Sequence, residues 1–367
     1  MSRLAWILGY LLGSAAALSA QATAAAGPQL DWHDVTAWGV EGRPAYEGME
    51  RAHWFDRLPA AAEQTVRPRV WILSRDTAGM LVRFRTDATA LHVDYKLLKP
   101  ELEFSHMPAT GVSGVDFYAR DDQGKWRWIG GNYPERGRSR YEVIKGLGLG
   151  LREYIAYLPL YNGVESFSIG VPAGARFEGL PPRDAKPLVF YGTSITQGAC
   201  ASRPGMAHTA ILGRRLEIPV VNLGFSGNGE MESAIGDYLV KIDAAAYIID
   251  CLPNMKPPQV TERCIPLVRQ LRARRPDTPI VLVEDRRYTN SWATPDKNHF
   301  HDENHAALRA AYEQLVREGV KNLHYIPGDH LYGDDSEGAV DASHATDLGF
   351  VRQADVMEPH LRAALGR

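Results

Sequence analysis

Cysteine is scarce in this chain of 367 residues, which has three: Cys200, Cys251 and Cys264. So small a number excludes a disulfide-built scaffold, and an odd count leaves a thiol free or paired between molecules. Cys200 and Cys251 follow strands that we expect to be neighbours, so a bond between them and two buried free thiols both stay open. An apolar core must hold the fold, and 45% hydrophobic residues can supply one.

An excess of either charge is also lacking, since 41 Lys and Arg against 44 Asp and Glu give a net charge of −3. No basic run is typical of a nucleic-acid-binding arm, so we expect no nucleic-acid partner. Long apolar runs are absent beyond residue 26. We therefore expect no stable membrane insertion of the mature chain.

Residues 1–26 differ from the rest of the chain. Arg3 is their only charged residue, an apolar stretch follows it, and small-x-small sites lie at residues 22–26. This pattern is typical of a secretory signal peptide, and the apolar stretch is short for the alternative, a single-span anchor. We expect the protein to be exported, to the periplasm or the medium.

Residues 27–171 contain short stretches of strand-like residues separated by glycine-rich turns. Strands are predicted at residues 69–73, 80–85, 90–95, 115–120, 126–129, 153–158 and 166–171. Their close spacing predicts an N-terminal β-sandwich domain. Residues 172–187, rich in proline and glycine, are the predicted linker.

Residues 188–367 alternate between apolar strands and helices. The predicted strands are at residues 188–191, 220–222, 246–249, 279–283 and 323–326. The predicted helices are at residues 207–216, 231–240, 259–274, 303–318 and 347–365. This alternation predicts an α/β domain with a flavodoxin-like, three-layer parallel sheet. Ligands of such sheets bind at the carboxyl ends of the strands.

Ser194 directly follows the first of these strands, in the sequence Gly-Thr-Ser. A serine at such a turn exposes its hydroxyl at the sheet edge, although a helix-capping role is the alternative. The Gly-x-Ser-x-Gly elbow of α/β-hydrolases is absent here and at Ser226, so that fold family is not indicated.

Gly227 and Asn254 follow the second and third strands. The N–H group of Gly227 and the amide of Asn254 are suited to an oxyanion hole, where one donor contributes roughly 3 kcal/mol. A ligand-free glycine turn and a turn-forming asparagine are the alternatives.

Asp341 and His344 precede the last helix. An aspartate on a tight turn can accept the Nδ1–H of the histidine and direct its Nε2 toward a nucleophile. We expect Asp347 to be the N-cap of the last helix.

These residues follow strands of one sheet in a fixed order: Ser194, Gly227, Asn254 and His344. In this order they resemble the SGNH (GDSL-like) hydrolase superfamily over about residues 185–367. Residues 114–118, Gly-Val-Asp-Phe-Tyr, are similar to the Gly-x-Asp-Leu-Tyr signature of a β-domain that precedes one SGNH subgroup.

The resemblance implies that Ser194 is the nucleophile, His344 the general base and Asp341 the residue that orients it. It also implies that the N–H groups of Ser194 and Gly227, with the amide of Asn254, hold the oxyanion. No cofactor is implied. Two departures concern neighbouring positions: threonine stands where aspartate usually precedes the nucleophile, and Leu-Pro-Asn-Met replaces the usual Gly-x-Asn-Asp.

A histidine cluster is the one candidate metal site: His299, His301 and His305. The last two would share a helix face, but a solvated helix start is the expected reading, and we predict no metal.

The sequence thus predicts an exported serine esterase that hydrolyses short acyl groups, above all acetyl, on carbohydrate. Arg203, Asn228 and Arg286 are the predicted substrate-binding residues, and no long apolar lid separates the motifs. The alternatives are a lipase or thioesterase of the same superfamily, and a non-catalytic glycan-binding protein that uses the tryptophans of the N-terminal domain. The sequence does not indicate the oligomeric state.

Overall fold

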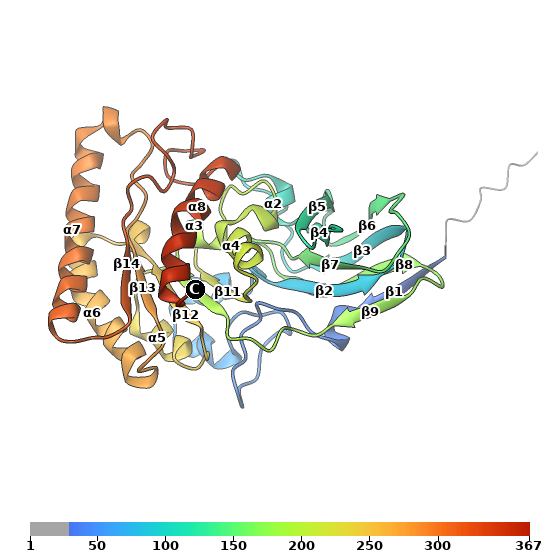
Figure 1. The fold of residues 1–367 in the computed structure, drawn as a ribbon, viewed down its shortest axis with the longest axis horizontal. Coiled ribbons are helices and arrows are strands. Elements are labelled where there is room, and N and C mark those ends of the chain that lie inside the picture. Colours follow the sequence, from blue (N-terminus) through green and yellow to red (C-terminus); the bar gives the residue numbers. More distant parts are fainter. Residues whose placement is uncertain (1–28) are drawn as a thin grey trace, which may run out of the picture.

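A computed structural model describes residues 29–367, so the predicted signal peptide lies outside the described residues. A β-rich N-terminal part and an α/β C-terminal part lie side by side along the long axis of the molecule (Figure 1). In the described part of the chain, no helix is both long and apolar enough to cross a membrane.

Two antiparallel sheets form the N-terminal part. The first contains, in spatial order, β1 (Leu30–Asp34), β8 (Val164–Pro172), β3 (Ala90–Leu97) and β6 (Arg138–Lys145). The second contains β5 (Trp126–Gly131), β4 (Asp116–Arg120), β7 (Arg152–Tyr157), β2 (Leu81–Thr86) and β9 (Phe177–Leu180). Alternate residues of both sheets meet in one core that includes Phe84, Phe117 and Phe167. The predicted β-rich N-terminal domain is confirmed.

Two predicted segments of the N-terminal part have another structure, and the strands β1 and β6 were not among those predicted. Residues 69–73 lie in a helix, α1 (Pro68–Ser74), because a short apolar run fits either structure and Pro68 at its first turn favours a helix. The predicted linker contains β9, which pairs antiparallel with β2 and therefore belongs to the second sheet.

The C-terminal part is built on one parallel sheet. Its spatial order is β11 (Val220–Gly224), β10 (Leu188–Gly192), β12 (Ala246–Asp250), β13 (Ile280–Val283) and β14 (Leu323–Ile326). This is the 2-1-3-4-5 order of flavodoxin-like folds, so the predicted fold class is confirmed. The strand order reverses beside β10, the strand that leads to Ser194.

Helices cover both faces of this sheet, as its mostly apolar and largely buried strands require. One face packs against α5 (Ser233–Leu239), α6 (Pro257–Arg274) and α7 (Pro295–Arg317). The other packs against α3 (Ser194–Gln197), α4 (His208–Leu216) and α8 (Asp347–Ala364). The first core also contains Leu58, Val70 and Leu73 of the N-terminal part. The two parts therefore share a hydrophobic core.

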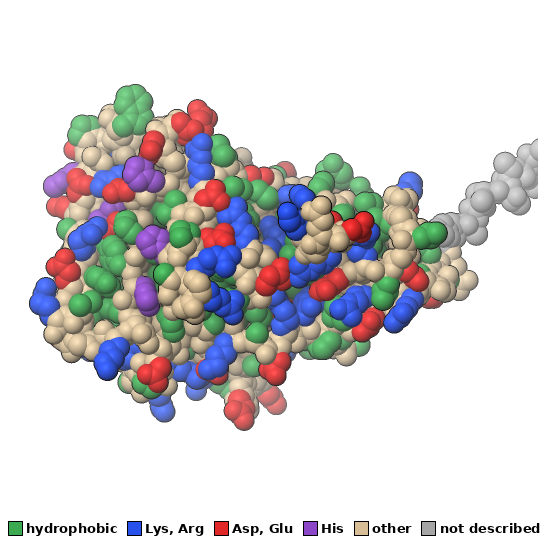
Figure 2. Space-filling model, in the orientation of Figure 1, with side chains coloured by type: hydrophobic (Ala, Val, Ile, Leu, Met, Phe, Trp, Pro, Cys, Tyr) green, Lys and Arg blue, Asp and Glu red, His purple; other side chains and the backbone are tan. Residues whose placement is uncertain are grey.

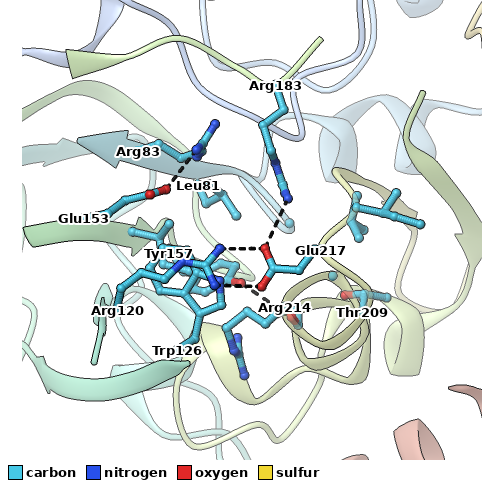
Figure 3. Close-up of a pocket in the computed structure, with 16 residues that line it drawn as sticks. Leu81, Arg83, Arg120, Trp126, Glu153, Tyr157, Arg183, Thr209, Arg214 and Glu217 are labelled. Carbon is cyan, nitrogen blue, oxygen red and sulfur yellow. Dashed lines mark hydrogen bonds and ion pairs between the residues drawn. The ribbon is translucent and has the colours of Figure 1, made fainter. Parts of the chain in front are cut away.

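Polar contacts also join the two parts, between the second β-sheet and α4 (Figure 3). Glu217, at the end of α4, accepts a hydrogen bond of 2.7 Å from Arg120 and lies 4.0 Å from Arg183. Arg214 lies over the rings of Tyr118 and Tyr157. The cavity between these side chains has a volume of about 50 Å³, enough for a few water molecules but not for a substrate.

The Gly-Val-Asp-Phe-Tyr sequence at residues 114–118 is part of this junction. Asp116 is fully buried and accepts hydrogen bonds from Arg203 Nη1 (2.6 Å) and the Gly205 backbone N–H (3.1 Å). A Cβ at Gly205 would lie 2.5 Å from the ring of Tyr118, so only glycine fits there. The motif thus fixes the chain that follows the Ser194 helix.

Lys and Arg side chains gather across the middle of one face of the molecule (Figure 2). A surface groove at the junction has four of them among its lining residues: Lys125, Arg203, Arg214 and Arg215. Arg203, a predicted substrate-binding residue, is already paired with Asp116 and lies over the Trp128 ring. Its observed contacts are structural.

Asp116→Ala should lower the free energy of unfolding by about 3 kcal/mol, because it leaves a half-buried arginine and a buried N–H group without their acceptor. Chemical denaturation measures the change. Glu165→Ala is the control, since Glu165 pairs with Lys96 on the exposed surface and such pairs contribute less than about 1 kcal/mol. Equal losses in both variants would contradict the anchoring role of Asp116.

Candidate active site

Ser194, His344 and Asp341 form a connected chain of hydrogen bonds. The Oγ atom of Ser194 lies 2.8 Å from Nε2 of His344, and Nδ1 of His344 lies 2.7 Å from Oδ2 of Asp341. The sequence placed these residues at one edge of the sheet, and the structure brings them into direct contact. The arrangement has the geometry of a serine–histidine–aspartate triad.

Ser194 is the first residue of α3, directly after β10. The N-cap is Thr193, whose hydroxyl accepts a hydrogen bond from the Ile195 N–H (3.3 Å). The capping alternative for Ser194 is therefore wrong, and its hydroxyl is available to His344. The Ser194 carbonyl accepts a hydrogen bond from the Tyr161 hydroxyl (3.2 Å), which ties the start of the helix to the N-terminal part.

Asp341 and His344 lie on a tight turn before α8. Ala342 has φ +73°, and the carboxylate of Asp341 also accepts the backbone N–H groups of Ser343 (3.1 Å) and His344 (2.8 Å). Partial burial raises the pKa of Asp341, but these hydrogen bonds outweigh it and leave the pKa below its ordinary value. The carboxylate is thus ionised and fixed as the acceptor of the imidazole Nδ1–H.

The loop after β11 lies against the Ser194 turn. The Phe225 N–H donates to the Gly192 carbonyl (2.9 Å), and Gly227 has φ +67°, a conformation that favours glycine. Asn254 Oδ1 accepts the Gly229 N–H (3.1 Å), which orients its amide. Within residues 29–367, the protein supplies no acceptor for the N–H groups of Ser194 and Gly227 or for Nδ2 of Asn254. These three donors are free to bind an oxyanion.

Two arginines of the N-terminal part hold this loop. Arg57 is fully buried and donates to the carbonyls of Asn222 (2.9 Å) and Gly224 (2.8 Å). Burial lowers its pKa to about 10, so it remains a cation at neutral pH. Arg67 donates to the side chain (2.8 Å) and the carbonyl (3.0 Å) of Asn228. Asn228, predicted to bind substrate, is engaged by the protein itself.

Arg286 does not reach the site either. Its side chain is 1% exposed and makes two hydrogen bonds, of 2.9 and 2.6 Å, with the buried carboxylate of Asp250 at the end of β12. The prediction that Arg286 binds substrate is wrong, because its charge is buried and paired. Asp347 is also not the N-cap of α8: Thr346 is, and Asp347 accepts the Ser202 N–H (2.9 Å).

A cavity of about 200 Å³ opens beside His344. Its apolar lining comes mainly from the N-terminal part: Ile72, Leu73, Phe104, Met107 and Tyr161. Sequence reasoning missed these residues, because their segments contain no motif and reach the site only through tertiary packing. Arg69, Lys99 and His106 add polar groups to the lining.

A buried polar network connects this cavity to the triad. Lys99 forms an ion pair with the buried Asp76, whose second oxygen accepts a hydrogen bond from Gln197 Nε2 (3.1 Å). Gln197 lies in α3 and accepts the Ser226 N–H (3.0 Å). The network links the N-terminal part, the Ser194 helix and the Gly227 loop.

The predicted histidine cluster proves to be partly buried and fully hydrogen-bonded. Asp285 lies 3.0 Å from His301 Nδ1 and 2.6 Å from His305 Nε2, while His301 Nε2 accepts the Tyr288 N–H (3.0 Å). His299 is on the surface beside Glu303. Protein groups thus satisfy the cluster. The three cysteines are buried and free, so the disulfide alternative is wrong.

The fold and the triad define a serine hydrolase with a flavodoxin-like sheet and an N-terminal β-domain. The GDSL-like Lipase/Acylhydrolase family profile matches residues 185–362, and the GxDLY profile, the N-terminus of SGNH-hydrolase-type esterases, matches residues 30–177. A Bacteroides ovatus protein described as a GDSL-like lipase is 32% identical, with a TM-score of 0.86 over 92% of this chain and 98% of the other. The chain belongs to this family of GDSL-like esterases.

Less similar structures share the fold. The salicylyl-acyltransferase SsfX3 of a tetracycline biosynthetic pathway is 19% identical, with a TM-score of 0.70 over 92% of this chain and 98% of its own. A family two carbohydrate esterase from Cellvibrio japonicus is 13% identical, with a TM-score of 0.59 over the same shares. No curated protein sequence matches significantly.

Ser194→Ala and His344→Ala should each lower kcat by at least about 10⁴-fold, because nucleophile and base act as one unit. Asp341→Asn should lower it less. Ester hydrolysis measures the effect, and unchanged circular dichroism verifies the fold. Ser226→Ala is the comparison at the other glycine-flanked serine. It should cost far less, although Ser226 lines the cavity, because its hydroxyl is not part of the Ser194–His344–Asp341 chain. Loss of activity in the Ser226 variant with a mild effect at Ser194 would contradict the assignment.

His305 should make stability depend on pH. Burial lowers its pKa, but Asp285 and Glu284 outweigh burial and raise it above the ordinary value. The folded state then holds the proton more tightly, so this stabilisation is complete below a pH of about 6.5 and is lost as the pH rises through the raised pKa. His305→Gln should reduce the fall of the urea midpoint above neutral pH, whereas the exposed His299→Gln should not. Identical pH profiles in all three proteins would contradict this.

Proposed function

We propose that Ser194 Oγ attacks the ester carbonyl while His344 Nε2 takes its proton. Asp341 stabilises the imidazolium and keeps its ring in place. The same Nε2–H then protonates the departing alcohol, and an acyl-serine remains. Water, deprotonated by His344, attacks this second ester, and the acid leaves as Ser194 regains its proton. The 2.8 Å contact between Ser194 and His344 is the observation that carries the proposal.

The oxyanion of both tetrahedral intermediates would be bound by the N–H groups of Ser194 and Gly227 and by Nδ2 of Asn254. This assignment is supported by the absence of an acceptor for any of the three donors among residues 29–367. Donors already fixed before the reaction need no reorganisation in the transition state. The contact with Gly229 fixes the amide of Asn254, and the contacts with Arg57 fix the end of β11.

The acyl group should be short. The cavity beside His344 holds about 200 Å³, below the roughly 300–1,000 Å³ of pockets for drug-sized ligands. Its lining includes the ion pair of Lys99 with the buried Asp76, and a long alkyl chain would have to pack against these charges. An acetyl group is small enough to avoid that contact. We therefore infer acetyl as the preferred acyl group.

The alcohol should be a hydroxyl-rich molecule, and carbohydrate is the class we propose. Arg69 and His106 line the open side of the cavity with hydrogen-bond donors. Structures of similar fold include an acetyl xylan esterase, Est2A, from Butyrivibrio proteoclasticus, which is 10% identical with a TM-score of 0.53. Export by the predicted signal peptide, which remains a prediction, would give the enzyme access to polymeric glycans.

A purely glycan-binding role has less support. Of the tryptophans of the N-terminal part, Trp128 alone is a prominently exposed side chain, and it lies beneath Arg203. Trp38 donates to the Arg83 carbonyl, and Trp71 is buried in the shared core. The described residues thus offer no row of exposed rings on which several sugars could stack.

The specificity constant kcat/KM should fall from acetyl to octanoyl esters of one alcohol. In an extended apolar groove each added methylene contributes up to about 0.8 kcal/mol, so a lipase-like site would give a steady rise instead. Acetate release from acetylated glycans tests the alcohol side, with Ser194→Ala as the background control. A rise through octanoate together with no acetate from glycans would contradict the proposal.

A further inference from the structure

Two side chains that take no part in the bond-breaking steps of the esterase mechanism lie beside the triad. Cys200 follows the Ser194 helix, and His106 comes from the loop before α2 (Ala109–Val112) of the N-terminal part. One ligand atom each of His106, Cys200 and His344 lie within 4.8 Å of one another. The rings of His106 and His344 have centroids 5.7 Å apart. Three segments distant in sequence thus bring two imidazoles and a thiol together.

The backbone of Cys200 adds an independent observation. Its φ is +68°, in the left-handed region that favours glycine, and the residue is buried and free of any disulfide. A non-glycine residue held there costs on the order of 1 kcal/mol, and such residues cluster at functional sites. The turn itself does not require cysteine, because alanine, serine or glycine could occupy it without placing a thiol against the catalytic histidine.

We propose that His106, Cys200 and His344 form a binding site for a thiophilic divalent cation, with Zn²⁺ as the best match, and that the bound ion inhibits the esterase. Thiolate and imidazole are the ligands that zinc prefers, and three protein ligands leave the fourth tetrahedral position to water. Ligand atoms around tetrahedral zinc lie roughly 3.3–3.7 Å apart, so side-chain shifts of about 1 Å close the site.

The outer shell of this site is already in place. Asp341 accepts the Nδ1–H of His344 at 2.7 Å, so the lone pair of the ring is on Nε2, as in the carboxylate–histidine–zinc arrangement of metal sites. On binding, the Cys200 thiol releases its proton to solvent. The hydrogen bond between the Ser194 hydroxyl and His344 Nε2 breaks, and Nε2 donates its lone pair to the ion instead. No redox change occurs. The base is blocked, and removal of the ion restores it.

The second histidine cluster does not compete for the ion. Asp285 already holds His301 and His305, and the Tyr288 N–H occupies His301 Nε2. A metal there would have to break three buried hydrogen bonds and would leave the Tyr288 N–H without an acceptor. At the His106 site, by contrast, His106 makes no side-chain hydrogen bond within the described residues.

Calorimetric titration of the full chain with ZnCl₂ tests the site independently of catalysis. We expect one equivalent to bind, with at least equal affinity in Ser194→Ala, where no hydroxyl competes for His344 Nε2, and Co²⁺ to give a thiolate-to-metal charge-transfer band. Cys200→Ser and His106→Gln should each weaken binding by more than about 100-fold, beyond the 10–100-fold effect of an outer-shell partner. Cys200→Gly, which suits the backbone, should do the same if serine disturbs the fold.

Variants that bind zinc more weakly should also be inhibited less by it. The rate of ester hydrolysis of each variant with zinc is compared with its own zinc-free rate. The surface variant His299→Gln is the matched control and should bind and be inhibited as the unaltered protein is. A chelator should reverse the inhibition. Binding that survives loss of Cys200, or that is lost only with His305→Gln, would overturn the proposal. So would zinc bound at this site with full activity retained, a result that would also contradict the role of His344 as base.

Discussion

The buried guanidinium of Arg57 is the constraint on which the active site depends. It lies under the carboxyl end of β11 and donates to the carbonyls of Asn222, Gly224 and Leu73. Burying a cation is unfavourable unless hydrogen bonds compensate, so these carbonyls must stay where the guanidinium can reach them. Its ring contact with Phe225 fixes the next residue of the loop as well. One N-terminal side chain thus sets the path that leads to Gly227.

Other contacts extend the same constraint around the site. Asp76, in the N-terminal part, reaches Gln197 of the Ser194 helix, and Tyr161 reaches the Ser194 carbonyl. Asp116 holds the chain that continues from that helix. The N-terminal part also supplies most of the apolar wall of the cavity. The β-domain is therefore a structural component of the active site and not an appended binding module. This arrangement explains why the two parts share a core.

Much of the architecture could be predicted from the sequence. Short, mostly apolar strands that alternate with helices indicated the parallel sheet, and the positions after its strands indicated Ser194 and His344. Local sequence patterns gave the wrong structure where tertiary contacts determine it. Residues 69–73 were predicted as a strand but lie in α1, where Val70 and Leu73 pack on the parallel sheet. Arg203 and Arg286 were assigned to substrate because no sequence pattern reveals that Asp116 and Asp250 neutralise them. The cavity wall was missed for the same reason.

Reaction with an alkyl fluorophosphonate, followed by mass spectrometric mapping of the adduct, tests most directly that Ser194 acts in a site completed by the N-terminal part. The reagent forms its bond through the same nucleophile and oxyanion donors as an ester. We predict one adduct, on Ser194, and a markedly slower reaction in a folded Arg57→Met variant. An adduct on another serine, or equal rates in the two proteins, would contradict the account.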